Sequence, residues 1–246
     1  MADLALWKQL GEWKKTCKWV DLTHELSSET PHWVGFFPMK TETFLDLDAS
    51  IFRVHTYTVV GQYGTHVDAA THMVNEGRSL EQFGPDDMVL PLCVIDKTAD
   101  VAANPDYVMT RADIEGWEKT YGKVPEGAFV VFQSGWGKRP WKAMDNLDAD
   151  GNRHFPGWRL DALRFLVEER NIAGIGHETS DAEAPATSGT TSYEVEKYIL
   201  EQDRFQIELL TNVEQCPPVG AIIFCTFPKL KGASGFTARC FALCPR

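Results

Sequence analysis

The sequence contains no long apolar run. No stretch approaches the roughly 18 consecutive apolar residues that a membrane-spanning helix needs, so no membrane partner is expected. The N-terminus also lacks the uninterrupted apolar segment and small-residue cleavage site of a signal peptide. Leu4, Trp7 and Leu10 instead recur at helical spacing, which predicts a docking helix within residues 1–17. We therefore expect a cytoplasmic protein.

Basic residues are few and scattered. The chain has 24 Lys and Arg against 35 Asp and Glu, which gives a net charge of -11. Such a chain would repel a phosphate backbone, and no basic cluster offsets this field, so a nucleic-acid partner is not expected. No GxGxxG or Walker pattern follows an expected strand, which argues against nucleotide chemistry. A small-molecule substrate is the better starting hypothesis.

Cysteines are present but do not form a metal-binding or disulfide pattern. The closest pair among the six, Cys240 and Cys244, lacks CxxC spacing. Reduced and mostly buried thiols are therefore expected. With 246 residues, 43% of them hydrophobic, the chain can bury one substantial core, and we expect a single domain over residues 1–246.

Short strands and a few helices alternate along the chain. Residues 110–122, with Thr110 as N-cap, 157–170, and 191–202, with a capping box of Thr191 and Glu194, are expected to be helices. Segments rich in β-branched and aromatic residues predict eight strands. Together they predict a mixed α/β domain. The expected strands are residues 18–26, 51–60, 88–96, 128–134, 172–177, 204–210, 221–227 and 236–243.

The segment GQYGTHVDAATH, residues 61–72, is typical of a metal site. His66 and Asp68 are two residues apart in a segment expected to be extended, so their side chains point to the same side. Gly64 and Thr65 could support them, and Gln62 offers an amide oxygen. A half-buried strand with hydrogen-bonded polar residues is the simpler interpretation, but three histidine or aspartate side chains in so short a run favour a metal.

His72 has two possible roles at such a site. It follows Ala69 and Ala70, whose small side chains allow a tight turn. Depending on that turn, His72 is either a further ligand or a free imidazole that acts as general base beside the metal.

Several motifs in order resemble the cyclase family of metal-dependent hydrolases, which includes bacterial kynurenine formamidases and isatin hydrolases. Residues 61–72 resemble its HxGTHxDxPxH signature, and DLTHELSSETPHW, SGWGKRPW and residues 155–183 resemble further family elements. RFQIELLTN and the segment around GASGFTAR resemble its closing strands and substrate loop. The resemblance implies a swivelling β/β/α domain with a mixed sheet, commonly assembled as a homodimer or homotetramer.

Two departures from the family pattern bear on the metal. Gln62 stands where the signature has a histidine, and Glu196 stands where two-zinc formamidases carry another. The remaining oxygen-rich donors suit Mn²⁺ better than Zn²⁺. The resemblance therefore implies one divalent ion held by His66 and Asp68, completed by Gln206 or Glu208. Gln62 stays a candidate ligand.

The resemblance also implies the reaction and its substrate contacts. Hydrolysis of a cyclic amide such as isatin, or of a related aromatic amide, is expected, with His72 favoured as the base. A lactone or carbamate hydrolase with the same site, or an inactive metal-binding protein, remains an alternative. Arg239 matches the family's loop arginine, and His177 is a further candidate contact. Independently of the resemblance, Trp33, Phe36 and Trp136, at expected loop positions, could stack on a flat substrate or simply pack in the core.

Overall fold

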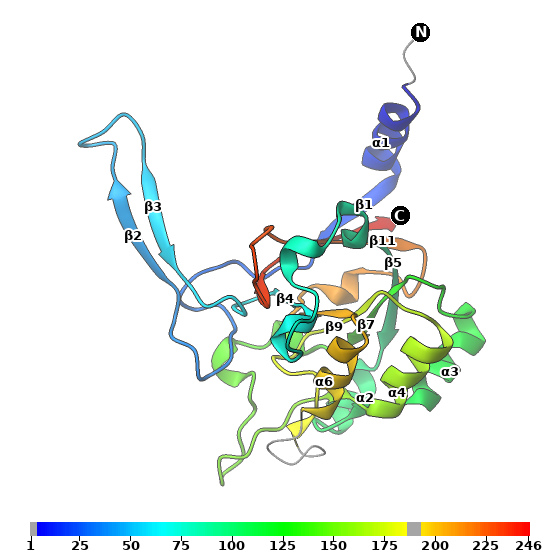
Figure 1. Cartoon of the computed structure of the whole chain (residues 1–246). Coiled ribbons are helices and arrows are strands. Elements are labelled where there is room, and N and C mark those ends of the chain that lie inside the picture. The colour runs from blue at the N-terminus through cyan, green and yellow to red at the C-terminus, as the bar shows by residue number, and fades with distance from the viewer. Residues whose placement is uncertain (1–3, 186–192) are drawn as a thin grey trace.

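One mixed sheet of nine strands organises residues 4–185 and 193–246, which are the residues described by the computed structural model (Figure 1). Its strand order is β1-β13-β11-β5-β7-β9-β10-β4-β12. The four central strands β5, β7, β9 and β10 run parallel, and the other neighbours pair antiparallel. The strands are β1 Cys17–Asp21, β4 His66–Asp68, β5 Val89–Asp96, β7 Phe129–Gln133, β9 Gly174–His177, β10 Phe205–Glu208, β11 Ala221–Thr226, β12 Gly235–Thr237 and β13 Arg239–Pro245.

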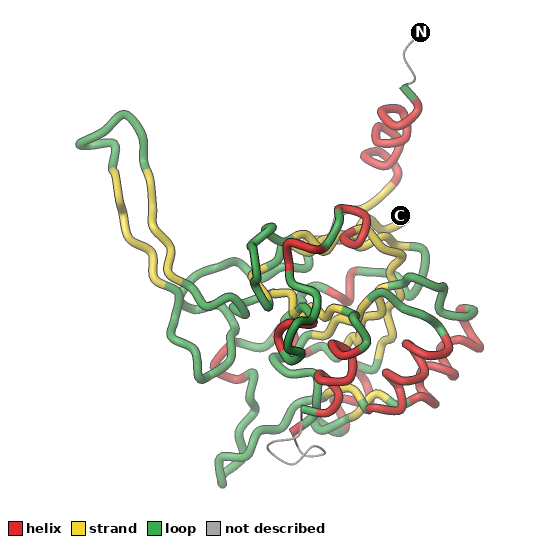
Figure 2. The backbone as a smooth tube through the Cα atoms, viewed as in Figure 1, coloured by secondary structure: helices red, strands yellow, loops and turns green. Residues whose placement is uncertain are grey.

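Two short two-stranded sheets and the helices complete the described fold (Figure 2). The additional strands are β2 Lys40–Leu45 with β3 Val54–Thr58, and β6 Val108–Met109 with β8 Gly157–Trp158. The α-helices are α1 Ala5–Thr16, α2 Thr98–Ala103, α3 Arg111–Tyr121, α4 Leu160–Arg164, which continues as the π-turn η6 Phe165–Glu169, and α6 Glu194–Glu201. Single 3₁₀ turns are η1 Ala70–His72, η2 Leu80–Gln82, η3 Pro85–Met88, η4 Trp136–Lys138, η5 Trp141–Ala143 and η7 Val213–Gln215.

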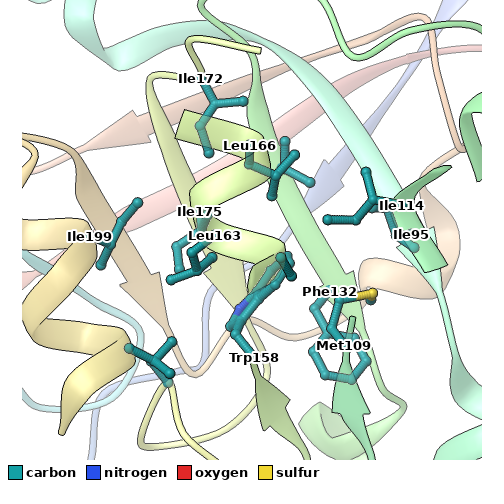
Figure 3. Packing of buried hydrophobic residues seen from close by; sticks show 14 of the residues in the cluster. Ile95, Met109, Ile114, Phe132, Trp158, Leu163, Leu166, Ile172, Ile175 and Ile199 are labelled. Carbon is teal, nitrogen blue, oxygen red and sulfur yellow. The ribbon is translucent and has the colours of Figure 1, made fainter. Parts of the chain in front are cut away.

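The central strands are buried on both faces and divide the core into two layers. Successive residues of a strand point to opposite faces, so Ile95 of β5 and Phe132 of β7 belong to one hydrophobic cluster, whereas Val94 and Val131 belong to the other. The first cluster packs against α3, α4 and α6, as Figure 3 shows for Ile114, Leu163 and Ile199. The strands β5 and β7 accordingly have nearly continuous apolar sequences, as expected for a covered sheet, whereas β10 alternates apolar and polar residues.

The helix predictions hold where the structure describes them. Thr110 caps α3 with a reciprocal capping box that involves Asp113, and the expected helix over 157–170 is α4 with its π-turn. Glu194 begins α6, but the predicted cap at Thr191 lies outside the described residues. A mixed α/β domain is confirmed.

Seven of the eight expected strands contribute to the nine-stranded sheet. The segment 51–60 does not: β3 pairs only with β2 in a hairpin whose strand residues are almost all exposed. The segment 236–243 divides at Ala238 into β12 and β13, which pair with different neighbours. The sequence prediction thus found the strand within 51–60 without distinguishing it from the strands of the central sheet, and it merged two others.

The N-terminal helix forms as expected, but it does not dock on its own chain. α1 buries no residue, and its Leu6 and Trp7 side chains are 83% and 74% exposed. Figure 1 shows α1 and the β2–β3 hairpin extending away from the body as two separate arms. No helix among the described residues is long and apolar enough to cross a membrane.

Candidate metal centre

The register between β4 and β10 brings four polar side chains to one face of the sheet. His66 pairs directly with Glu208, and Asp68 pairs with Gln206. Residues directly opposite on antiparallel strands share a face, and alternation turns Val67 and its opposite neighbour Ile207 to the other face. The four polar side chains are consequently gathered under α6 although β4 and β10 are far apart in sequence.

His66, Asp68 and Glu208 form a buried cluster whose ligand atoms all lie within 4.8 Å of one another. His66 Nε2 is 3.4 Å from Asp68 Oδ2 and 3.5 Å from Glu208 Oε2. His66 Nδ1 donates to the carbonyl oxygen of Gly64 at 2.8 Å, so a neutral His66 presents the lone pair of Nε2 to the cluster. Gly64 adopts φ +64°, a conformation that favours glycine.

The Gln206 amide contacts more acceptors than it can satisfy. Gln206 Nε2 lies 3.0 Å from Glu208 Oε1, 3.1 Å from Glu196 Oε1 and 3.2 Å from Asp68 Oδ2. An amide carries only two N–H groups, so one carboxylate oxygen is left without a donor. Asp68 Oδ1 and Gln206 Oε1 are also buried without a hydrogen-bond partner in the described structure. The cluster is short of positive groups.

Because the cluster is buried, the lack of positive groups raises the free energy of the ionised carboxylates. Burial, followed by the charge of Asp68, raises the pKa values of Glu196 and Glu208 well above their usual range. Burial opposes the charged form of His66, yet the neighbouring Asp68 carboxylate outweighs it and raises the pKa of His66. A divalent cation would offset this clustered negative charge. The donor set of one imidazole and several carboxylate oxygens therefore fits a divalent metal ion.

His72 lies beside the cluster on the tight turn η1, which buries Ala69 and Ala70. Its Nε2 is 3.6 Å from Glu196 Oε1, and its Nδ1 is 3.3 Å from the amide nitrogen of Gln62. His72 does not belong to the His66, Asp68 and Glu208 cluster. The amide nitrogen of Gln62 contacts His72 and Ser234, and ligation by its oxygen stays a prediction.

A cavity of about 210 Å³ opens onto the cluster. Trp33 and Phe36 form an apolar wall, with their rings edge to face at 5.1 Å. Among the described residues, the lining includes no lysine or arginine. The other lining residues are Gln62, His66, Asp68, His72, Met73, Ser180, Asp181, Tyr193, Glu196, Glu208 and Leu209.

Two predicted substrate contacts, Trp136 and Arg239, do not line this cavity. Trp136 is buried in the core, where its indole N–H donates to the carbonyl oxygen of Met144. Arg239 pairs with Asp21 at 2.7 Å and borders a different cavity. The structure thus places both side chains away from this cavity, because sequence order does not determine which face or edge a side chain reaches.

His177 lies beneath the cluster instead of in the cavity. Its Nδ1 donates to Thr179, whose hydroxyl donates onward to a backbone carbonyl, and its Nε2 is 3.7 Å from Glu208 Oε1. Burial, followed by the charge of His66, lowers the pKa of His177 to about 4. His177 Nε2 makes no hydrogen bond in the described structure, and His177 does not line the cavity, so the expected substrate contact stays a prediction.

Sequence reasoning missed Glu196 as a member of the site and treated it only as the position of an absent histidine. A signal was present, because Ile199 and Leu200 follow it by three and four residues and place Glu196 on the buried face of α6. Asp181 was also missed. Burial raises its pKa to about 6, although Arg153 pairs with it at 2.8 Å.

Comparisons with known proteins identify the family of the chain. The profile of the Cyclase family matches residues 20–184, which is more than half of the chain. The chain belongs to the Cyclase family. Isatin hydrolase of Roseibium aggregatum is 29% identical over 203 residues, covering 79% of this chain and 76% of that protein.

Solved structures show the same fold. Isatin hydrolase A from Labrenzia aggregata bound to benzyl benzoate has a TM-score of 0.89 at 30% identity, over 98% of this chain and all of that one. An isatin hydrolase bound to the product analogue thioisatinate has a TM-score of 0.90 at 25% identity, over the whole of both chains. The predicted swivelling β/β/α fold of the cyclase family is confirmed.

Addition of Mn²⁺ should stabilise the protein, because the ion would neutralise buried carboxylates that no described cation pairs. At a concentration about 100 times its dissociation constant, the ion should add about 2.7 kcal/mol to the free energy of unfolding. Thermal unfolding followed by circular dichroism, with and without MnCl₂, measures this change. Asp68→Asn, which keeps the shape but removes a charge, is the control and should show little response. An equal response in both proteins would place the ion elsewhere.

Proposed function

We propose that this chain is a metal-dependent hydrolase that opens a cyclic amide, with isatin or a related aromatic amide as substrate. The observation that carries the proposal is the β4–β10 register, which sets His66 opposite Glu208 and Asp68 opposite Gln206 on one buried face. Membership of the Cyclase family and the likeness to isatin hydrolases support it.

One divalent ion would be held by His66, Asp68 and Glu208, and Gln206, whose amide reaches the same carboxylates, would complete the set. Oxygen donors outnumber the single imidazole nitrogen, which favours Mn²⁺ over Zn²⁺. The ion would polarise the amide carbonyl and make water a stronger nucleophile near neutral pH.

His72 would act as the general base. It lies at the cavity, is 34% exposed, and is held apart from the ligand cluster by the η1 turn. It would accept a proton from the attacking water and return this proton to the departing ring nitrogen, so that the amide C–N bond breaks and a carboxylate forms. Glu196, 3.6 Å away, would stabilise the protonated imidazole between these two transfers.

The cavity suits a flat, uncharged ring. Trp33 and Phe36 offer an aromatic wall, and aromatic rings pack well against such surfaces in offset or edge-to-face arrangements. The described lining has carboxylates and no lysine or arginine, so it offers an anionic substrate no cationic partner. This combination supports a neutral aromatic amide as the substrate class.

Replacing His72 should separate its role from that of the ligands. His72→Ala should keep about one Mn²⁺ per chain and lose on the order of 10²–10⁴ in kcat for isatin hydrolysis, because general bases contribute rate enhancements of this size. His66→Ala should lose metal and activity together. Absorbance kinetics and elemental analysis after dialysis give the two readouts, and His154→Ala, outside the cavity, is the matched control.

Several outcomes of that experiment would contradict the proposal. Full metal occupancy with an unchanged rate in His72→Ala would remove His72 from the reaction. Loss of metal in His72→Ala would make it a ligand instead of the base. No turnover of isatin by the wild-type chain, with turnover of the corresponding lactone or of a carbamate, would keep the site but change the substrate class.

We further propose that a second copy of this chain covers the two projecting arms. On the β2–β3 hairpin, Phe44 is 70% exposed and Ile51 91% exposed, and an isolated two-stranded hairpin is marginal in water. Leu6 and Trp7 of α1 are similarly uncovered. Exposed apolar surface on separate extensions is typical of segments that are buried on assembly.

Sedimentation equilibrium should therefore report a homodimer or homotetramer at micromolar concentration. Ile51→Asp combined with Phe44→Asp should shift the chain toward the monomer, because a charge would be buried at the contact. Leu147→Asp, at another exposed position in the loop after η5, serves as the control and should leave the mass unchanged. A monomeric wild-type protein would contradict this proposal.

A further inference from the structure

The amide of Gln62 connects the loop before β4 with the loop before β12 at the edge of the site. Its nitrogen atom lies 3.3 Å from His72 Nδ1 and 3.2 Å from Ser234 Oγ. Gly235 makes room for this arrangement, since a Cβ there would lie 2.6 Å from the same amide nitrogen. The Gln62 side chain is therefore confined between a serine hydroxyl, a glycine and the ring of His72.

Either the oxygen or the nitrogen of the Gln62 amide can face His72, and this choice determines which ring nitrogen of the imidazole carries the proton. An amide N–H₂ group would donate to Nδ1, so the ring proton would reside on Nε2 and no lone pair would face the cavity. An amide oxygen would accept from Nδ1–H and leave the Nε2 lone pair free. The oxygen and nitrogen of an amide have the same shape, so both orientations fit the observed positions, and the Ser234 hydroxyl can donate or accept.

We propose that Gln62, supported by Ser234, is a positioning residue that holds His72 in its Nδ1–H tautomer. Gln62 presents its oxygen to His72 Nδ1 while Ser234 donates to that oxygen. This inference rests on the proposed function, because a base must offer a lone pair on the cavity side, where His72 Nε2 stands 3.6 Å from Glu196. It gives Gln62 a role other than metal ligation.

Two substitutions of similar size test the hydrogen bond. Gln62→Glu keeps an acceptor toward Nδ1, whereas Gln62→Met removes every hydrogen-bonding group. Gln62→Met should lower kcat for isatin roughly tenfold or more, within the range that a general base contributes, with KM nearly unchanged. Gln62→Glu should stay within a few-fold of wild type. All three proteins should retain about one divalent ion per chain by elemental analysis.

The tautomer itself can be observed without any substrate. In ¹⁵N-histidine-labelled protein loaded with Zn²⁺, which is diamagnetic, long-range ¹H–¹⁵N spectra distinguish the protonated from the unprotonated ring nitrogen. The His72 signals are those absent from His72→Asn. Wild type and Gln62→Glu should show the proton on Nδ1, and Gln62→Met should show a shift toward Nε2–H.

The results separate this inference from the proposed function. A wild-type His72 protonated on Nε2, or a Gln62→Met protein with unchanged tautomer and kcat, overturns the positioning role but leaves hydrolysis intact. Metal loss in Gln62→Met overturns it in favour of ligation. Absence of isatin hydrolysis in every protein, with the expected tautomers, supports the positioning role and rejects only the substrate.

Two controls guard against a general loss of structure. Ser234→Ala removes only the support of the amide and should reproduce part of the Gln62→Met effect on kcat and on the tautomer. Gln215→Met, at an exposed position of η7, should behave as wild type. If Ser234→Ala and Gln215→Met are indistinguishable in both readouts, the proposed support by Ser234 is wrong.

Discussion

The pairing of β4 with β10 is the constraint on which the rest of the site depends. β4 is only three residues long, but it lies between β10 and β12 and is fully buried. A slip of one residue would turn His66 and Asp68 to the opposite face and bring Val67 under α6. Thr65 helps to fix the register, since its hydroxyl donates to the carbonyl oxygen of Leu209 just beyond β10.

This register concentrates negatively charged side chains in a buried position. Asp68, Glu196 and Glu208 are each no more than 5% exposed, and a single glutamine amide bridges them. Burying carboxylates without cations costs free energy, so such a cluster persists only when something compensates it, by protonation or by a bound cation. The same imbalance that destabilises the empty cluster would give the site its affinity for a divalent ion.

Much of the site could be predicted from local sequence, because the relevant spacing is local. His66 and Asp68 share a face in any extended conformation, and the same holds for Gln206 and Glu208. Glu196 could be predicted to be buried from the pattern of α6, but not to approach Gln206 and His72. Arg239 does not reach the cavity, because its partner Asp21 comes from a distant segment. Such contacts depend on long-range topology, which spacing along the chain does not encode.

The fold likewise divides into features that local sequence predicts and features that depend on long-range contacts. β-Branched and aromatic residues predicted β5, β7, β9, β10 and β11, and the apolar runs of β5 and β7 reflect strands that are covered on both faces. The segment 51–60 has a similar content of β-branched and aromatic residues, yet β3 lies in an exposed hairpin. β-Propensity indicates that a segment can form a strand, but it does not indicate which part of the molecule covers that strand. If a second copy of the chain covers this hairpin, the apolar residues of segment 51–60 are buried in the assembly although they are exposed in the single chain.

Anomalous diffraction from Mn²⁺-loaded crystals, measured at the manganese absorption edge, tests the central claim most directly. The account predicts one strong peak per chain, within coordination distance of His66 Nε2 and of carboxylate oxygens of Asp68 and Glu208. A peak coordinated by other residues, or a well-ordered His66, Asp68 and Glu208 cluster without an anomalous peak in a fully loaded protein, would contradict it.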